Sequence, residues 1–159
     1  MTHSIPREIE RKFLVRDERL PGDWRTFPST RIAQGYLVVN EAEAREVRVR
    51  KRGEVFTLTA KTGGGVERDE AEVELTSEQF EALWPLTEGW RLEKTRYEIP
   101  VGDFTAELDA YRGRHEGLRV VEVEFPDGEA AEAFSPPEWF GEEVSGEDAY
   151  RNQRLARGG

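Results

Sequence analysis

Hydrophobic and polar residues alternate along most of this chain, which is the pattern of half-buried β-strands. In the first such run, apolar Ile9 and Phe13 fall on one parity and charged residues such as Glu10 on the other. Three consecutive glycines, Gly63–Gly65, supply the backbone freedom that a tight turn needs. The alternation predicts eight strands, over residues 8–15, 31–39, 46–51, 55–61, 67–75, 91–99, 104–111 and 118–125.

Helical signals are fewer than strand signals. Thr76 can cap a helix with the apolar stripe Phe80, Leu83 and Trp84, which Pro85 then ends. We expect a shorter helix over 128–134 and a C-terminal helix over 146–157 that turns Ala149, Leu155 and Ala156 inward. Many antiparallel strands with few helices predict a mainly β (α+β) fold, either a closed barrel or a two-sheet sandwich.

Composition narrows the class of protein. A length of 159 residues fits a single domain, 1–159, and eight Phe, four Tyr and four Trp favour a packed core. The absence of Cys excludes disulfides and zinc–thiolate sites, and no apolar run approaches the ~18 residues of a membrane span. The N-terminus lacks the apolar stretch of a secretion signal, so we expect a cytoplasmic protein. The net charge of -10 argues against nucleic-acid or membrane partners.

The polar faces of the predicted strands are sorted by charge. Alternate residues of a strand lie about 6.5–7 Å apart on one face, where like charges repel each other. Sorted carboxylates suggest a metal site, and sorted Lys and Arg suggest a polyanion. Periodicity does not decide whether these faces line a lumen or cover an exterior. The acidic positions include Glu8, Glu10, Glu70, Glu72, Glu74, Glu107, Asp109, Glu122 and Glu124, and the basic ones include Lys12, Arg48, Arg50, Lys61, Lys94 and Arg96.

These residues match a known family in order and spacing. Glu8-Ile9-Glu10-Arg11-Lys12 resembles the E-x-E-x-K signature of the CYTH proteins, the triphosphate tunnel metalloenzymes. The resemblance runs from about residue 5 to residue 156 and is closest to the compact bacterial branch, which includes inorganic triphosphatases. The later matching segments are Gln34-Gly35-Tyr36-Leu37, Arg48-x-Arg50, Lys61, Glu72-x-Glu74, Glu93–Tyr97, Glu107-Leu108-Asp109, Glu122-Val123-Glu124, Trp139–Val144 and Tyr150-Arg151-Asn152.

The resemblance implies an eight-stranded closed antiparallel barrel with a charged tunnel and the apolar parity facing outward, often as a homodimer. It implies Mg²⁺ or Mn²⁺ as the cofactor, which suits oxygen-only ligands. His3 and His115 have no ligand spacing, and we expect both on the surface. The implied metal ligands are Glu8, Glu10, Asp109, Glu122 and Glu124; the phosphate-binding residues are Lys12, Arg48, Arg50, Lys61, Lys94, Arg96 and Arg151.

The catalytic set that the resemblance implies is Lys94, Glu72 and Glu74. Lys94 or a Glu–water pair would serve as general base, while Glu72 and Glu74 would act as further metal ligands or position water. The favoured function is metal-dependent hydrolysis of the terminal phosphoanhydride of inorganic triphosphate. Alternatives on the same tunnel are a class IV adenylyl cyclase or a thiamine or nucleoside triphosphatase. A non-catalytic polyphosphate-binding module is a further alternative, and a charged sandwich for protein contacts lies outside the family.

Overall fold

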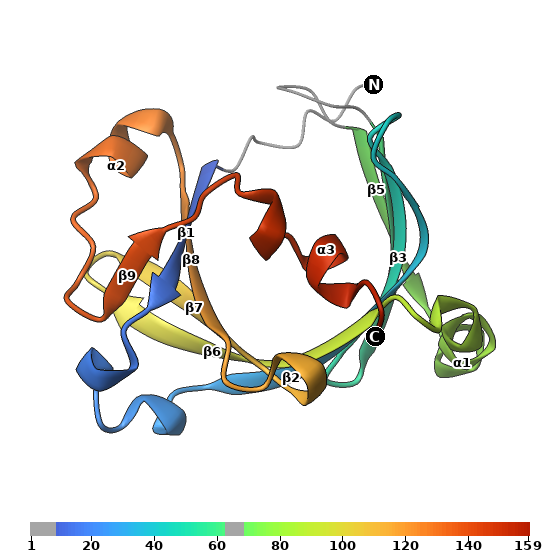
Figure 1. Ribbon diagram of the computed structural model, residues 1–159, viewed down its shortest axis with the longest axis horizontal. Helices are drawn as coiled ribbons and strands as arrows, with labels where there is room; N and C mark the ends of the chain where they lie inside the picture. The colour runs from blue at the N-terminus through green and yellow to red at the C-terminus, as the bar shows by residue number, and fades with distance from the viewer. Residues whose placement is uncertain (1–8, 63–68) are drawn as a thin grey trace. The chain divides into compact units, whose positions relative to one another are not determined.

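The computed structural model describes residues 9–62 and 69–159 of the chain (Figure 1). Glu8, His3, Glu67 and the expected turn at Gly63–Gly65 therefore lie outside the described residues. Three helices accompany the strands in this part of the chain: α1 (Ser77–Leu83), α2 (Gly128–Ala133) and α3 (Asn152–Ala156). The strands are β1 (Ile9–Val15), β2 (Ser29–Asn40), β3 (Arg45–Arg52), β4 (Val55–Thr62), β5 (Asp69–Leu75), β6 (Arg91–Val101), β7 (Phe104–Tyr111), β8 (Arg119–Phe125) and β9 (Phe140–Glu143).

The strands form one sheet in the order β5-β4-β3-β2-β6-β7-β8-β1-β9. The expected mainly β class with antiparallel pairing is confirmed. Two details differ from an eight-stranded closed barrel. β9 is a ninth strand, and no pairing among the described residues joins β5 to β9 or β1. The sequence pattern did not predict β9, because four residues are too few to show an alternation. Gly141 allows this strand to approach the backbone of Leu14 closely.

Contacts divide the chain into two compact units. Unit 1 comprises Met1–Ser29, Arg96–Ala110 and Leu118–Glu147. Unit 2 comprises Thr30–Thr95, Tyr111–Gly117 and Asp148–Gly159.

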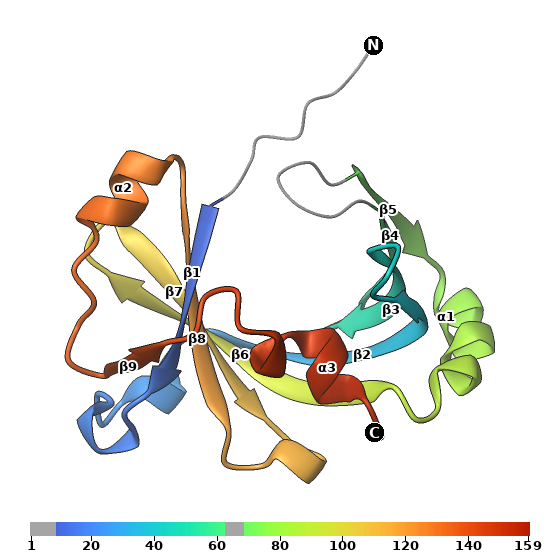
Figure 2. The same cartoon turned by 45° about the horizontal axis from the view of Figure 1, so that its top comes forward.

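Unit 1 has its apolar core on one face of β1, β7 and β8. Val121 and Val123 are fully buried there, and the ring of Phe13 lies 5.0 Å from that of Phe140 on β9. Figures 1 and 2 show α2 beside the ends of β1 and β8. Arg11 shares the apolar parity but joins this layer through its guanidinium, which donates to both carboxylate oxygens of Glu143 and to the carbonyl oxygen of Ala131.

Unit 2 packs α1 against the sheet. The ring of Phe80 on α1 lies 5.0 Å from Phe56 on β4 and 5.2 Å from Trp84. Thr76 and Gln79 form the expected capping box at the start of α1. Figures 1 and 2 both place α1 on one side of β3 and β5 and α3 on the other. No helix of the described residues is long and apolar enough to cross a membrane.

The C-terminal helix is shorter than expected. The predicted helix over 146–157 is a 3₁₀ turn at Asp148–Tyr150 followed by α3, because Gly146 has a positive φ of 76° and Arg151 an extended backbone. Leu155 and Ala156 are buried as expected, whereas Ala149 is exposed. His115 is half-buried, with its ring in contact with the carbonyl oxygen of Leu155.

The close approach of Gly35 to Thr87 gives a stability prediction. A Cβ at Gly35 would lie 2.5 Å from both the Cβ and the Oγ1 of Thr87. Thr87 is fully buried, and its hydroxyl donates to the carbonyl oxygen of Trp84 and accepts from Arg91. Gly35→Ala should therefore lower the free energy of unfolding by about 1–3 kcal/mol, the usual effect of overpacking.

Urea unfolding of the two proteins measures this difference. Gly22→Ala is the matched control, because a Cβ there meets nothing within 4 Å. Equal losses in the two variants would show that the Gly35 contact with Thr87 is not what limits this position.

Candidate active site

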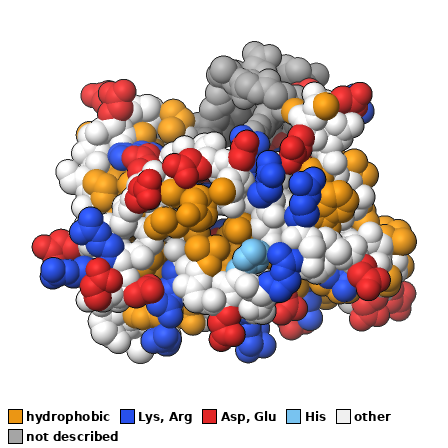
Figure 3. Space-filling view, viewed as in Figure 1, with side chains coloured by type: hydrophobic (Ala, Val, Ile, Leu, Met, Phe, Trp, Pro, Cys, Tyr) orange, Lys and Arg blue, Asp and Glu red, His pale blue; other side chains and the backbone are white. Residues whose placement is uncertain are grey.

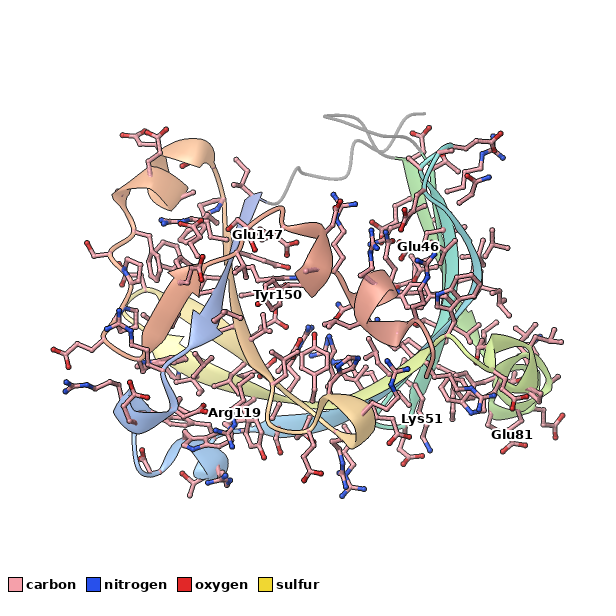
Figure 4. All side chains as sticks on the ribbon, viewed as in Figure 1. Glu46, Lys51, Glu81, Arg119, Glu147 and Tyr150 are labelled. Carbon is pink, nitrogen blue, oxygen red and sulfur yellow. The ribbon has the colours of Figure 1, made fainter. Side chains whose placement is uncertain are left out.

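Register aligns charged residues across β2, β3, β4 and β5 of unit 2. Pairing places Tyr36, Arg48, Thr59 and Glu72 in one cross-strand row, and Gln34, Arg50, Thr57 and Glu74 in the next. A third row continues with Glu46, Lys61 and Glu70. Because alternate residues point to opposite faces, all three rows share the face opposite Phe56 and α1. Figure 4 shows Glu46 on β3 on the side of α3, and Figure 3 shows Lys and Arg side chains close to Asp and Glu side chains over this strand.

Arg48 carries an unsatisfied donor. Its Nε is buried and has no hydrogen-bond partner among the described residues. A buried donor without a partner costs about 1–3 kcal/mol relative to a satisfied one. An oxyanion at this face would supply an acceptor for it.

Lys61 shows how closely the cations of this face are crowded. Burial, followed by the charges of Arg48 and Arg50, lowers the pKa of its ammonium. Glu70, whose carboxylate oxygen lies 4.0 Å from Lys61 Nζ, offsets part of this effect. Glu46 acts in the same direction as Glu70, and an anion bound beside Lys61 would do so as well.

Arg50 is held by a residue that the sequence analysis did not assign to the site. The Oε1 of Gln34 accepts hydrogen bonds from Arg50 Nε at 3.0 Å and Nη2 at 2.9 Å. The Nε2 of Gln34 in turn donates to the Tyr36 hydroxyl at 2.8 Å. Their shared parity with Arg50 across β2 and β3 was the signal that could have identified both.

The proposed catalytic residues lie at different places in unit 2. Glu72 accepts a hydrogen bond from the Thr59 hydroxyl at 3.0 Å, and Glu74 lies opposite Thr57 on the same face. Lys94 is fully buried, with its Nζ 5.6 Å from the centre of the Tyr111 ring.

Arg151 lies at the start of α3. Its side chain is exposed and pairs with Asp148 at 3.2 Å. Among the described residues, no recorded contact joins it to Arg48 or Arg50.

Unit 1 carries the acidic counterpart on β1 and β8. Glu10 lies opposite Glu124, and Lys12 lies opposite Glu122, which it pairs with at 3.0 Å. Glu10 is exposed as a residue, yet desolvation by the surrounding protein is the largest effect on its carboxyl group. Burial, together with the charge of Glu122, raises the pKa of Glu10 to about 7. The structure thus places two other expected metal ligands, Glu122 and Glu124, close enough to Glu10 to oppose its ionisation.

Arg96 and Asp109 pair with each other. The Nε and Nη2 of Arg96 donate to the two carboxylate oxygens of Asp109 at 2.8 and 2.9 Å, and Nη1 lies 2.8 Å from Glu107. Both Arg96 and Asp109 are buried. Burial opposes the charge of Arg96, but its bond to Asp109 outweighs this and raises its pKa. Asp109 is therefore already neutralised by a guanidinium.

The carboxylates of unit 1 have the chemistry to bind a divalent cation, but the described side chains are not arranged as a complete binding site. The donors of Glu10, Glu122 and Glu124 are oxygens only, the set that Mg²⁺ and Mn²⁺ prefer over zinc. Burial and the charges of Glu122 and Glu124 raise the pKa of Glu10, and a bound cation would act in the opposite direction, as Lys12 does. Within residues 9–62 and 69–159, no three acidic or histidine side chains are arranged to hold an ion, and Glu8 lies outside those ranges.

A cavity of about 440 Å³ lies elsewhere in unit 2. Of the predicted site residues, only Lys94 lines it. Its Ala33 and Lys51 pair across β2 and β3 with the opposite parity to Gln34 and Arg50. Figure 4 shows Lys51 farther along β3 than Glu46. The cavity is thus not the site of the aligned rows, and we base no function on it.

Comparison with known proteins identifies the family of this chain. The model of the CYTH domain matches residues 6–147. The chain is 44% identical over 156 residues to an inorganic triphosphatase of Nitrosomonas europaea, covering 94% of this chain and 96% of that protein. It is 35% identical over 153 residues to an inorganic triphosphatase of Acetivibrio thermocellus, covering 95% and 94%.

Solved structures give the same result. The crystal structure of an inorganic triphosphatase is 41% identical, with a TM-score of 0.74 over 96% of this chain and 95% of that one. A protein from Pyrococcus horikoshii shares the fold at 20% identity, with a TM-score of 0.56 over 79% and 82% of the chains. The chain therefore belongs to the CYTH domain family, whose triphosphatases depend on a metal ion.

Proposed function

We propose that this protein hydrolyses the terminal phosphoanhydride bond of inorganic triphosphate with Mg²⁺ or Mn²⁺. The observation that carries the proposal is the buried, unsatisfied Nε of Arg48 within the same crowded face as Arg50 and Lys61. Two relatives over 30% identical along nearly the whole chain are inorganic triphosphatases.

The cations of unit 2 are assigned to the phosphate oxygens. A linear triphosphate carries several negative charges, so binding and charge stabilisation provide most of the catalysis. The guanidinium groups of Arg48 and Arg50 suit bidentate contacts with phosphate, and Lys61 adds a movable point charge. Further phosphate-binding roles are proposed for Lys12, Lys94, Arg96 and Arg151.

The metal is assigned to carboxylates of unit 1. Glu10, Glu122 and Glu124 would hold it, with Glu8 as a further ligand. Asp109 completes the proposed set only if it exchanges its contact with Arg96. When bound, the metal neutralises charge on phosphate oxygens.

The chemical step transfers the terminal phosphoryl group to water. The oxygen of water bonds to the terminal phosphorus, the P–O bond to the bridging oxygen breaks, and the products are orthophosphate and pyrophosphate. Glu72, whose carboxylate the Thr59 hydroxyl holds in place, and Glu74 are assigned to position the water. The general base is Lys94, or one of these glutamates acting through a water molecule.

A homodimer forms part of the proposal. Val73 and Leu86 of unit 2 expose 53% and 71% of their surface, as apolar side chains that a second copy could cover. Sedimentation velocity of the assayed protein measures its mass, and a monomer at assay concentration would remove the dimer from the proposal.

A phosphate-release panel tests the function. We expect turnover of tripolyphosphate to exceed that of ATP, thiamine triphosphate and pyrophosphate, and to require Mg²⁺ or Mn²⁺ added after EDTA treatment. Formation of cyclic AMP from ATP would favour the cyclase alternative. Tripolyphosphate binding without phosphate release would favour a non-catalytic binding module.

Arg48 provides the mutational prediction. Arg48→Gln should lower kcat/KM for tripolyphosphate by about 10²-fold, the usual loss when a donor to a charged transition state is removed. The melting temperature should stay within a few degrees or rise, because the variant removes a buried cation that repels Lys61.

The matched control is Arg45→Gln on the same strand. Arg45 is exposed and only pairs with Glu43 at 3.6 Å, so turnover should be unchanged. A comparable loss of stability and activity in Arg48→Gln would instead indicate a structural role for Arg48.

The raised pKa of Glu10 gives a pH prediction for the metal-free protein. The folded carboxyl titrates at about 7 against an ordinary value of 4.5. Between these values the folded state binds more protons than the unfolded state, so this group lowers the free energy of unfolding as pH rises from about 5 to 8. Glu10→Gln lacks this carboxyl, so its free energy of unfolding should decline less as pH rises. The variant should therefore become more stable relative to the wild type with increasing pH.

Urea unfolding in EDTA between pH 5 and 8 measures this difference. Glu81→Gln, on the side of α1 that points away from the sheet in Figure 4, is the control and should run parallel to the wild type. Parallel curves for Glu10→Gln as well would contradict the raised pKa.

A further inference from the structure

We propose that Gln34, hydrogen-bonded to Tyr36, is a positioning residue that fixes the guanidinium of Arg50 for triphosphate without neutralising its charge. The inference deepens the proposed function and rests on it. It assigns a role to the Gln34-Gly35-Tyr36 segment, which the catalytic scheme above does not use.

The geometry ties the amide to one edge of the guanidinium. Gln34 is fully buried, and its Oε1 accepts from both Arg50 Nε and Arg50 Nη2. One acceptor shared by two donors of the planar fork fixes the plane of the guanidinium as well as its distance. The two residues are also cross-strand partners in β2 and β3, so backbone pairing fixes the origin of both side chains.

The N–H groups of Arg50 determine which way the amide faces, because they only donate, and Tyr36 accepts from its other end. Gln34 Nε2 donates to the Tyr36 hydroxyl at 2.8 Å, which leaves Oε1 directed at Arg50. Burial, followed by the charge of Glu46, raises the pKa of Tyr36 to about 12, so the hydroxyl stays neutral across the working range of pH. With an amide reversed, Nε2 would oppose the N–H groups of Arg50, and no bond would form.

A neutral amide suits this position better than a carboxylate. A carboxylate would fix Arg50 equally well, as Asp109 fixes Arg96, but would also cancel the charge that attracts an anion. Gln34 supplies the orientation through its dipole and itself adds no negative charge beside Arg50. The chain thus uses an ionic clamp for an arginine in unit 1 and a neutral clamp for an arginine in unit 2.

The neighbouring arginine shows the complementary state. Arg48 is the cross-strand partner of Tyr36, yet its Nε has no partner among the described residues. The same face therefore holds one arginine whose Nε edge is set by the protein and one whose Nε edge is left for an outside acceptor. Such a pair fits a chain of phosphates, in which successive oxygens meet a fixed donor and an adjustable one.

The test is a double-mutant cycle between Gln34 and Arg50. Gln34→Glu keeps the size of the side chain but pairs Arg50 with a charge, and should raise KM for tripolyphosphate about 10- to 100-fold with a smaller change in kcat. Gln34→Leu removes the bonds, and Tyr36→Phe removes the acceptor at the other end of the amide and should have a smaller effect in the same direction. In an Arg50→Lys background, which lacks the planar fork, Gln34→Leu should change KM by less than about twofold.

Controls separate positioning from folding. Gln79→Glu on α1 makes the same charge change on the opposite side of the sheet from Glu46 and should leave KM unchanged. Melting curves identify any Gln34→Leu protein that does not fold, and Gln34→Glu and Tyr36→Phe then decide the question. Equal effects of Gln34→Leu with Arg50 and with Lys at position 50 would overturn the inference, as would an unchanged KM in Gln34→Glu.

Failure of the proposed function gives a different result. Wild-type protein that binds tripolyphosphate but releases no phosphate would overturn the triphosphatase assignment alone. The same cycle, measured as tripolyphosphate affinity by calorimetry without metal, then judges the role of Gln34. Wild-type protein that neither binds nor cleaves tripolyphosphate would overturn both.

Discussion

The repulsion between like charges at every second residue of neighbouring strands is the constraint on which this structure depends. β-pairing sets those residues directly opposite one another, so Glu10 faces Glu124 and the row of Arg48 lies beside the row of Arg50. Like charges in such positions destabilise a sheet. The opposite face must supply compensating burial, which it does in unit 1 through Phe13, Val121 and their neighbours. A strand in which polar and apolar residues alternate provides the charged face and the buried apolar face together.

The two units relieve the repulsion differently. In unit 1, Lys12 pairs with Glu122 and Arg96 with Asp109 and Glu107, so two built-in cations meet part of the negative charge. Burial and the charges of Glu122 and Glu124 raise the pKa of Glu10. In unit 2 the protein meets Arg50 with an amide rather than a carboxylate, and it leaves Arg48 Nε without a described acceptor. Unit 2 thus orients one arginine with a neutral group, whereas in unit 1 Lys12 and Arg96 pair with carboxylates.

Much of this could be read from the sequence because strand parity is a local property. The positions of the eight longer strands, the faces of Arg48, Glu72 and Glu122, and the capping box of α1 all follow from residues a few positions apart. The pairings do not. Arg11 carries the parity of the core although it is charged, and its partner Glu143 is 132 residues away. Nothing local distinguishes Asp109 as a partner of Arg96 from Asp109 as a metal ligand.

The same limit explains why Gln34 was missed and why it matters. Gln34 carries no charge, so a search for strand faces sorted by charge does not detect it. Its importance arises only when register sets it against Arg50 and burial removes the water that would otherwise compete for the guanidinium. An anion bound at this face would recover free energy that the fold spends on holding Arg48, Arg50 and Lys61 together. Substrate affinity and the stability of the substrate-free protein therefore depend on the same repulsive contacts. A residue that orients a cation without neutralising its charge favours affinity.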